Sequence, residues 1–270
     1  MVGAAPNMDT SYSVLLCDVA QAQAPNAEPT GKLAPAGLSP EHLRVVCQTL
    51  KQRGLNCEIV ELAPHCPEFV EDANVLVVRG WSPETANAAL TSIVDAPFDT
   101  FTYGHGQVKN AHTRHLVFAA DTARAPNRDK GVHTVLPWSS LEAINSAREF
   151  ISSALATEHL NAGCVLKYPD VNKCGISWHG DGERRITVLY RLGSVSARRP
   201  FHLMWFKQGE PISQPITISL AHGDFLISST KAVGKDWKTR KIPTLRHSTG
   251  FLGHGPVPQT TRKKRKTREQ

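Results

Sequence analysis

Long hydrophobic runs, paired cysteines and glycine-rich phosphate loops are all missing from this sequence of 270 residues. No apolar run approaches the roughly 20 residues of a membrane-spanning helix. Met1–Thr10 also lacks the basic and then apolar layout of a secretory signal. The sequence therefore predicts an intracellular protein, in the nucleus or cytoplasm, with no membrane partner. Contents of 40% hydrophobic and 20% charged residues are ordinary for a chain with a buried core.

Cysteine is present but scattered, and no Cys-x-x-Cys pair occurs. The six residues are Cys17, Cys47, Cys57, Cys66, Cys164 and Cys174. Several lie inside apolar runs, which is typical of buried free thiols in a reducing compartment. We therefore expect neither disulfides nor a cysteine zinc site.

The net charge of +7 is concentrated at the C-terminus, where residues 262–270 hold six Lys and Arg against one Glu. We predict a basic disordered tail over residues 256–270. Its composition fits a nuclear import signal or an arm that binds phosphates. A merely solvated terminus is the alternative.

Residues 1–72 are predicted to form a small N-terminal α/β segment. Ser39 and Pro40 are typical of a helix start, and Gly54 ends the helical spacing that follows. Residues 20–38, rich in Ala, Pro, Gly and Gln, are expected to be a linker. The expected strands cover residues 12–17, 57–62 and 74–79.

Residues 73–255 are predicted to form a second, larger domain. An amphipathic helix is expected over residues 140–155, because its apolar positions recur at helical spacing. Short β-rich runs separated by turns follow, at residues 164–168, 174–179, 185–192, 201–207, 216–220, 224–229 and 243–247. Seven strands without helical periodicity between them indicate a barrel or jelly roll. The fold class expected for the whole chain is therefore α+β.

Two candidate metal ligands lie within this β-rich half. His179 and Asp181 are two residues apart, and side chains in an extended segment alternate between its two faces. Both can therefore reach one ion. A mixture of imidazole and carboxylate ligands on one face of a metal is typical of non-haem iron(II) oxygenases.

A third ligand must come from another strand. His247 ends a β-prone run and follows Asp181 by enough strands to return to the same place in a jelly roll. His202, His222 and His254 are competitors. His254 lies among glycines and prolines and His222 precedes a Gly-Asp turn, so we choose His247.

The stretch from Val165 to Gly250 resembles the AlkB-like branch of the 2-oxoglutarate dioxygenases, in particular AlkB-like proteins of large DNA viruses and protists. A looser resemblance extends back to about Ala73. The matching blocks, in order, are His179–Arg185, Arg191–Gly193, Trp205–Phe206, Lys231–Lys238 and Leu245–His247. The resemblance implies a double-stranded β-helix and iron(II) ligands at His179, Asp181 and His247.

The same resemblance implies 2-oxoglutarate as co-substrate, with two departures from the family's pattern. The usual Asn-x-Tyr reads Leu166-Lys167-Tyr168, so only the tyrosine is present. The arginine expected after the last ligand does not appear before Arg262. Because a dicarboxylate needs a cation, we choose Arg191, on an apolar strand, as the substitute. Arg246 and Arg262 are fallbacks, and a structural ion pair is the alternative for Arg191.

The substrate suggested by the resemblance is a nucleobase in DNA or RNA, which the enzyme would hydroxylate or demethylate. An aromatic side chain can stack on a base and cations can neutralise phosphates. The candidate substrate-binding residues are Tyr103, Arg114, Glu183, Arg184, Trp237 and Lys238. Two alternatives stay open: hydroxylation of a protein side chain by the same chemistry, and a jelly-roll nucleic-acid-binding module without catalysis.

Overall fold

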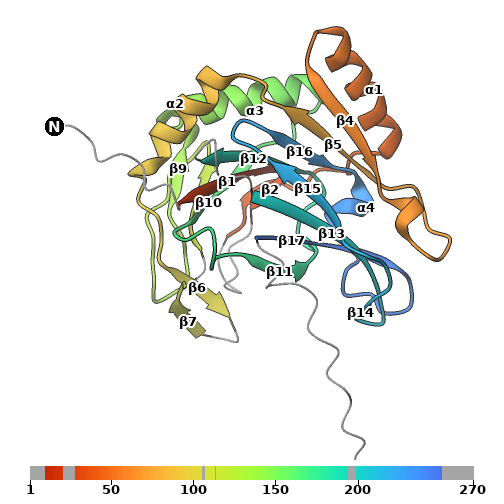
Figure 1. The fold of residues 1–270 in the computed structure, drawn as a ribbon. Coiled ribbons are helices and arrows are strands. Elements are labelled where there is room, and N and C mark those ends of the chain that lie inside the picture. The colour runs from red at the N-terminus through yellow and green to blue at the C-terminus, as the bar shows by residue number, and fades with distance from the viewer. Residues whose placement is uncertain (1–9, 21–27, 105–106, 113, 194–198, 251–270) are drawn as a thin grey trace, which may run out of the picture.

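The structure is a computed structural model that describes residues 10–20, 28–104, 107–112, 114–193 and 199–250. Within these ranges the chain is an α+β fold built on two β-sheets (Figure 1), which confirms the predicted class. The predicted tail over residues 256–270, and His254 with it, lies outside the described residues.

The larger sheet has eight strands and is curled. Their spatial order is β4 (Asn56–Glu61), β5 (Asn74–Arg79), β16 (Phe225–Ser228), β12 (Thr187–Gly193), β1 (Ser11–Cys17), β10 (Ala162–Tyr168), β8 (His115–Ala120) and β9 (Val135–Pro137). Neighbouring strands are antiparallel except for β8 and β9, which are parallel.

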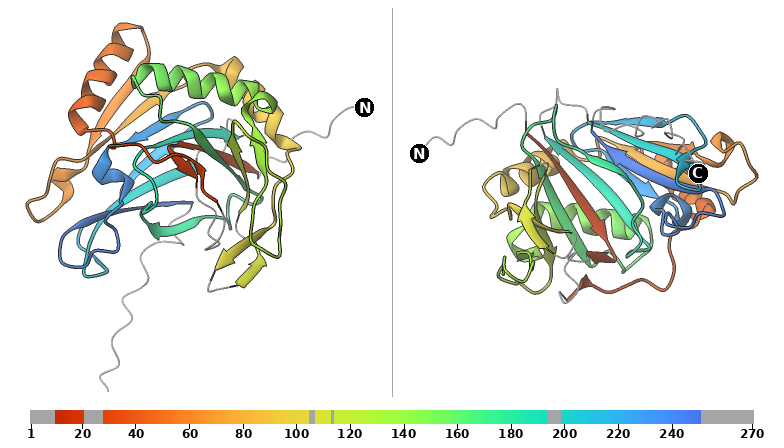
Figure 2. Two further views of the ribbon diagram at one scale, coloured as in Figure 1. Left: turned by 180° about the vertical axis from the view of Figure 1, so that it is seen from behind. Right: turned by 90° about the horizontal axis from the view of Figure 1, so that it is seen from below.

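The smaller sheet lies against the concave side of the larger one (Figures 1 and 2). Its strands are β11 (Ile176–His179), β17 (Thr244–Thr249), β13 (Arg199–Lys207), β14 (Glu210–Pro211) and β15 (Ile216–Leu220). Two short ribbons complete the β-structure: β2 (Val19–Ala20) with β3 (Thr30–Gly31), and β6 (Phe101–Gly104) with β7 (Gln107–Asn110). One apolar cluster takes side chains from both sheets, among them Val77, Leu203 and Leu245, so the two sheets pack face to face.

Three helices cover the outer face of the larger sheet (Figure 2). They are α1 (Pro40–Gln52), α2 (Pro83–Val94) and α3 (Glu142–Ala154). The 3-10 turn η2 (Trp138–Ser140) joins them through Trp138, and the other short helices are α4 (Thr230–Val233) and the 3-10 turn η1 (Ala63–His65). The predicted start of α1 is confirmed, because the Ser39 side chain accepts a hydrogen bond from the His42 backbone N–H. The helix predicted over residues 140–155 is also confirmed, as α3.

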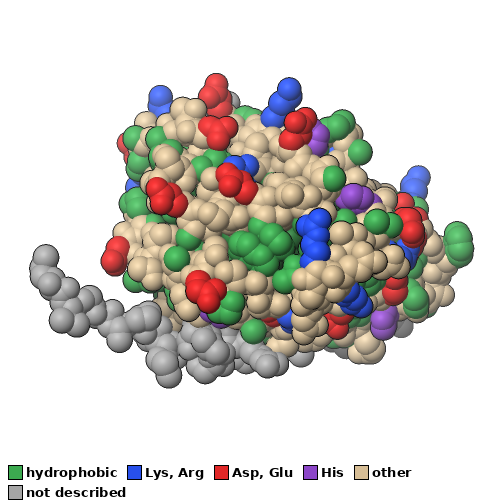
Figure 3. Space-filling view, turned by 90° about the horizontal axis from the view of Figure 1, so that it is seen from above, with side chains coloured by type: hydrophobic (Ala, Val, Ile, Leu, Met, Phe, Trp, Pro, Cys, Tyr) green, Lys and Arg blue, Asp and Glu red, His purple; other side chains and the backbone are tan. Residues whose placement is uncertain are grey.

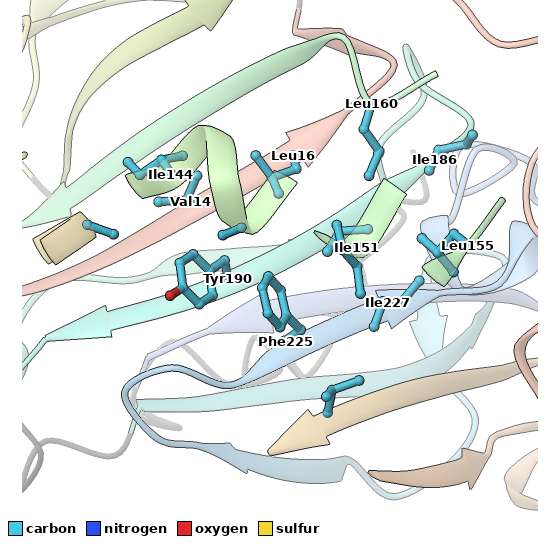
Figure 4. Close-up of a cluster of buried hydrophobic side chains, with 14 of the residues drawn as sticks. Val14, Leu16, Ile144, Ile151, Leu155, Leu160, Ile186, Tyr190, Phe225 and Ile227 are labelled. Atoms are coloured by element: carbon cyan, nitrogen blue, oxygen red, sulfur yellow. The ribbon is translucent and has the colours of Figure 1, made fainter. Parts of the chain in front are cut away.

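The outer face of the larger sheet carries the main apolar core (Figure 4). Val14 and Leu16 of β1 alternate with residues that face the other sheet, and they pack with Tyr190 and with Ile144 and Ile151 of α3. Burying each such side chain stabilises the fold by about 1.5–3 kcal/mol. The intervening positions of the same strands are therefore free to carry polar groups toward the smaller sheet.

Strands β1 and β4, expected as part of an N-terminal segment, share the larger sheet with strands that follow later in the chain. Strand β1 lies between β10 and β12, in the middle of the larger sheet. Strand β4 pairs with β5, which in turn pairs with β16. The predicted boundary between residues 72 and 73 thus falls between two strands that pair with each other.

Three further features concern the cysteines, membrane-spanning helices and the distribution of surface charge. All six cysteines are free. Among the described residues, no helix is long and apolar enough to cross a membrane. On the helix-covered face seen in Figure 3, acidic and basic side chains are interspersed around an apolar area, so the cations are not concentrated on this face.

Candidate metal centre

A β-bulge in β11 turns its last residue toward the other sheet. Ile176 pairs with Thr249 and His179 pairs with His247, so three steps along β11 match two along β17. Without the extra residue, Ile176 and His179 would lie on opposite faces. The bulge therefore brings His179 beside His247, and their ring centroids are 4.4 Å apart.

His179, Asp181 and His247 form a group that can hold a metal ion, as predicted. Asp181 Oδ1 lies 3.8 Å from His179 Nε2 and 3.9 Å from His247 Nε2. Ligand bonds of about 2.0–2.2 Å to a central ion fit separations of this size. Asp181 follows the end of β11, and a hydrogen bond from its backbone N–H to the Val233 carbonyl, 2.9 Å, holds it there.

Both imidazoles have their Nε2 close to the aspartate. His179 Nδ1 donates to the Ser177 carbonyl at 2.7 Å, which leaves Nε2 as the unprotonated nitrogen. Burial, and then the neighbouring His179, lowers the pKa of His247 to about 4. His247 is therefore neutral and able to ligate at neutral pH.

A buried arginine keeps Asp181 ionised. Burial alone would raise the pKa of this carboxyl, but Arg184, followed by His247 and His179, lowers it overall. Arg184 Nε is 3.9 Å from Asp181 Oδ2, and the same guanidinium pairs with Glu183. Arg184, expected to contact substrate, is thus buried next to a candidate ligand, while Glu183 is half-buried.

Close packing fixes the loop that carries Asp181. A Cβ on Gly180 would overlap the Gly234 carbonyl oxygen and lie 2.7 Å from the Trp237 Cβ. Trp237 is half-buried against this loop, and the exposed Lys238 has its Nζ 5.5 Å from the Trp237 ring centroid. The tryptophan predicted to stack on a base therefore also supports the ligand loop.

Asp18 secures the far end of the same loop, a role that the sequence did not reveal. Its buried carboxylate accepts hydrogen bonds from the backbone N–H groups of Ala34, Arg185 and Ile186. An aspartate between a strand and a linker is common in any sequence. Only the three convergent donors give it this role.

The predicted co-substrate residues lie on the inner face of the larger sheet. Tyr168, at the end of β10, and Arg191, in β12, are both fully buried. Arg199, at the start of β13, contacts Tyr168 with its guanidinium carbon 3.8 Å from the ring centroid. Arg199 was not predicted from the sequence, because it ends a stretch with several polar residues, Ser194–Arg199, and is followed by Pro200. Its burial was the missing signal.

The remaining candidates fall around this interior. Tyr103, in the β6–β7 hairpin, packs against the inner-face cluster that contains Tyr168. Burial raises the pKa of Cys164 to about 11, and the charges of Arg184 and then Arg114 oppose this rise. Arg246 lies instead between the Phe206 and Trp237 rings, at 4.4 and 5.4 Å.

The two competing histidines that the structure describes, His202 and His222, lie outside the group. His202 bonds Thr217 Oγ1 and the Gly250 carbonyl through its two nitrogens, at 2.9 and 3.0 Å. His222 accepts from the Gly193 N–H and donates to Asn87. Each ring nitrogen therefore has a partner within the protein.

No family profile matches the chain. The uncharacterised protein R156 of Acanthamoeba polyphaga mimivirus is 30% identical to it over 246 residues, which cover 89% of this chain and 95% of the viral protein. The chain belongs to one family with this viral protein. The relationship extends over nearly the whole of both proteins, although the name of the relative specifies no activity.

Proposed function

We propose that this protein is an iron(II)- and 2-oxoglutarate-dependent dioxygenase that oxidises a nucleobase in DNA or RNA. The observation that carries the proposal is the convergence of His179, Asp181 and His247 from two separate strands and a loop. Two imidazoles and one carboxylate suit iron(II) and leave further coordination positions open. Bound iron, with the keto acid and dioxygen, would supply an oxidant able to hydroxylate a carbon.

The arrangement of the strands supports a double-stranded β-helix. Successive strands β10 to β13 alternate between the two sheets, with β10 and β12 in the larger and β11 and β13 in the smaller. Strands β15 and β17 then extend the smaller sheet, and β16 the larger. This alternation places the ligand-bearing strands β11 and β17 side by side.

The protein's own groups would supply geometry and charge. The bulge in β11 and the bond from His179 to Ser177 orient one ligand, and Arg184 keeps Asp181 anionic. Tyr168 and Arg191 are the residues proposed to bind 2-oxoglutarate. Both are buried, so solvent would be excluded from the co-substrate.

A nucleic acid is the preferred substrate because of the charges near the centre. Lys238 is exposed next to Trp237, and the predicted basic tail over residues 256–270 would add phosphate contacts and serve in nuclear import. A target base in a duplex would need to be flipped out to reach the metal. Tyr103 and Arg114 would take part in holding it.

Succinate formation tests the enzymatic proposal. Protein loaded with iron(II) should convert 2-oxoglutarate to succinate, and His179→Ala should lower the rate by about 100-fold or more. His222→Ala, which alters a histidine outside the triad, is the matched control and should keep the wild-type rate. Absence of succinate from every preparation of folded wild type would leave the non-catalytic binding module as the better account.

The substrate class needs a separate comparison. Methylated oligonucleotides should stimulate turnover, and removal of residues 256–270 should weaken oligonucleotide binding and flatten its dependence on salt. Peptides that stimulate turnover where oligonucleotides do not would replace the nucleobase with a protein side chain.

A further inference from the structure

Arg191 presents a free guanidinium edge to the space between the sheets. It is 1% exposed, and its Nη1 donates to the Tyr12 carbonyl at 2.7 Å and to Ser13 Oγ at 2.9 Å. Its Nε and Nη2 have no acceptor among the described residues. These two nitrogens form the edge of an arginine that binds both oxygens of a carboxylate.

A second arginine reaches the same place from the smaller sheet. Arg199, 3% exposed, donates from Nη2 to the Cys174 carbonyl at 2.6 Å and from Nε to Thr249 Oγ1 at 3.2 Å. Its guanidinium stacks on the Tyr168 ring. Its Nη1 and the Tyr168 hydroxyl are both buried without a partner in the described part of the chain. Together with Arg191, four unpartnered donors thus come from these three side chains.

Strand β1 places two serines beside these donors. Ser11 lies between Tyr168 and Gly193 in the sheet, and Ser13 is the neighbour of Arg191. Both serines are buried, and the Ser11 hydroxyl also lacks a partner among the described residues. At these two positions strand β1 therefore carries small side chains on the inner face.

The two guanidinium groups act on each other electrostatically. Burial, and then the charge of Arg199, lowers the pKa of Arg191 to about 9. Among the described residues, Tyr168 opposes this lowering of the Arg191 pKa and no carboxylate does. Two buried cations without a counter-charge are costly, and an anion would relieve that cost.

We propose that Arg191, Arg199 and Tyr168 form a carboxylate-binding site that makes the metal centre selective for keto acids with a second carboxylate. The proposal rests on the proposed function for the identity of the co-substrate. Arg199 contacts Thr249, which lies two residues beyond His247 on the same face of β17, about 7 Å along the strand. A five-carbon diacid spans a comparable distance, so its keto end would face the metal ligands.

The test compares two keto acids of equal length on protein loaded with manganese(II), which avoids turnover. Calorimetry should show wild type binding 2-oxoglutarate about 100-fold more tightly than 2-oxopentanoate, which lacks the far carboxylate. Arg199→Met and Arg191→Met should each reduce this ratio to about 5-fold or less, with unchanged affinity for manganese(II) and for 2-oxopentanoate. Arg199→Lys and Arg191→Lys should give intermediate ratios, because a lysine keeps the charge and loses the fork.

Arg148→Met is the matched control. Arg148 also stacks on an aromatic ring, 4.9 Å from the Trp138 centroid, and donates to the Leu160 carbonyl, but it lies on α3. Its variant should keep the wild-type ratio. If a methionine variant fails to fold, the matching lysine variant carries the same comparison.

A second experiment tests the carboxylate site independently of the dioxygenase proposal. Glutarate added to metal-free wild type should raise the melting temperature, and should not do so for the two methionine variants. If manganese-loaded wild type binds neither keto acid while glutarate still acts in this way, the dioxygenase proposal fails and the carboxylate site stands. A keto-acid ratio unchanged in both methionine variants, or no glutarate effect on wild type, would overturn the site.

Discussion

The two faces of the larger sheet differ in the buried charged residues that lie against them. The face toward the helices is apolar, whereas the buried charged side chains Asp181, Arg184, Arg191 and Arg199 lie on the side toward the smaller sheet. Fully or nearly buried ionised groups are rare unless they are paired or bind a ligand. Asp181 and Arg184 are paired with each other, and the two remaining arginines lack a carboxylate partner among the described residues.

The buried thiol of Cys17 makes stability depend on alkaline pH. Burial raises its pKa from 9.0 to about 12. Because the folded-state pKa lies above the unfolded value, the contribution of this thiol is fully present below pH 9 and is lost between pH 9 and about 12. Over that window we expect a loss on the order of 1 kcal/mol per pH unit from this group.

Urea unfolding across that pH range measures the effect. Cys17→Ala should give a shallower fall in unfolding free energy than wild type, whereas Cys66→Ala, at a half-buried position, should follow the wild-type slope. Equal slopes for wild type and Cys17→Ala would contradict the assigned burial of the thiol.

At the scale of elements, the ligand loop depends on close contact with the segment after α4. A Cβ at Gly180 would collide with the backbone of Gly234, which cannot move easily because its own φ is +76° and it lies beside the Leu245 carbonyl. Gly180→Ala should therefore weaken metal binding by at least tenfold and destabilise the fold by about 2 kcal/mol. Calorimetric metal titration and thermal unfolding measure the two effects.

Gly182→Ala is the control in the same loop. Its Cβ would meet Trp237 Nε1 at 3.7 Å, an ordinary contact, so metal binding should stay at the wild-type level. A Gly180→Ala variant that binds metal as tightly as Gly182→Ala would contradict the packing described for the loop.

Local patterns were enough to predict several elements. Helical spacing and the Ser39–Pro40 start located α1, and the amphipathic pattern located α3. Alternation and the His-x-Asp spacing correctly predicted two ligands, although the expected reason was only partly right. Strand β11 ends at His179, and a bulge, rather than regular alternation, sets the direction of the His179 side chain. A bulge depends on which strand pairs alongside, and this information is not local to residues 176–181.

Contacts between residues far apart in the chain could not be predicted from the sequence pattern. Arg199 and Asp18 matter through partners far along the chain: Arg199 contacts Tyr168 and Cys174, and Asp18 contacts Arg185. A single sequence shows residue types and their spacing, and gives no sign of such contacts. For the same reason the sequence indicates a ligand for Arg191 but gives no sign of the second guanidinium near it.

At the scale of the whole molecule, the N-terminal strand is central. Strand β1 fills the position between β10 and β12, and its register brings Ser11 and Ser13 beside Tyr168 and Arg191. A strand from the N-terminal part of the chain therefore completes the middle of the larger sheet, between β10 and β12.

A chain that begins at residue 73 should therefore fail to fold, because the larger sheet would lose β1 from its middle and β4 from its edge. Circular dichroism should show no cooperative unfolding transition. A chain that ends at residue 255 is the control and should fold, since every described strand precedes that point. A cooperative, metal-binding fragment over residues 73–270 would contradict the structural role of β1.

The most direct test of the account is the stoichiometry of metal binding by His179, Asp181 and His247. Anaerobic titration with iron(II) should give one ion per wild-type chain, and His179→Ala and His247→Ala should each lower the affinity by about 100-fold or more while remaining folded. His222→Ala should bind as wild type does, because its ring already has partners in Gly193 and Asn87. Undiminished binding in both triad variants, or no binding by folded wild type, would contradict the central claim.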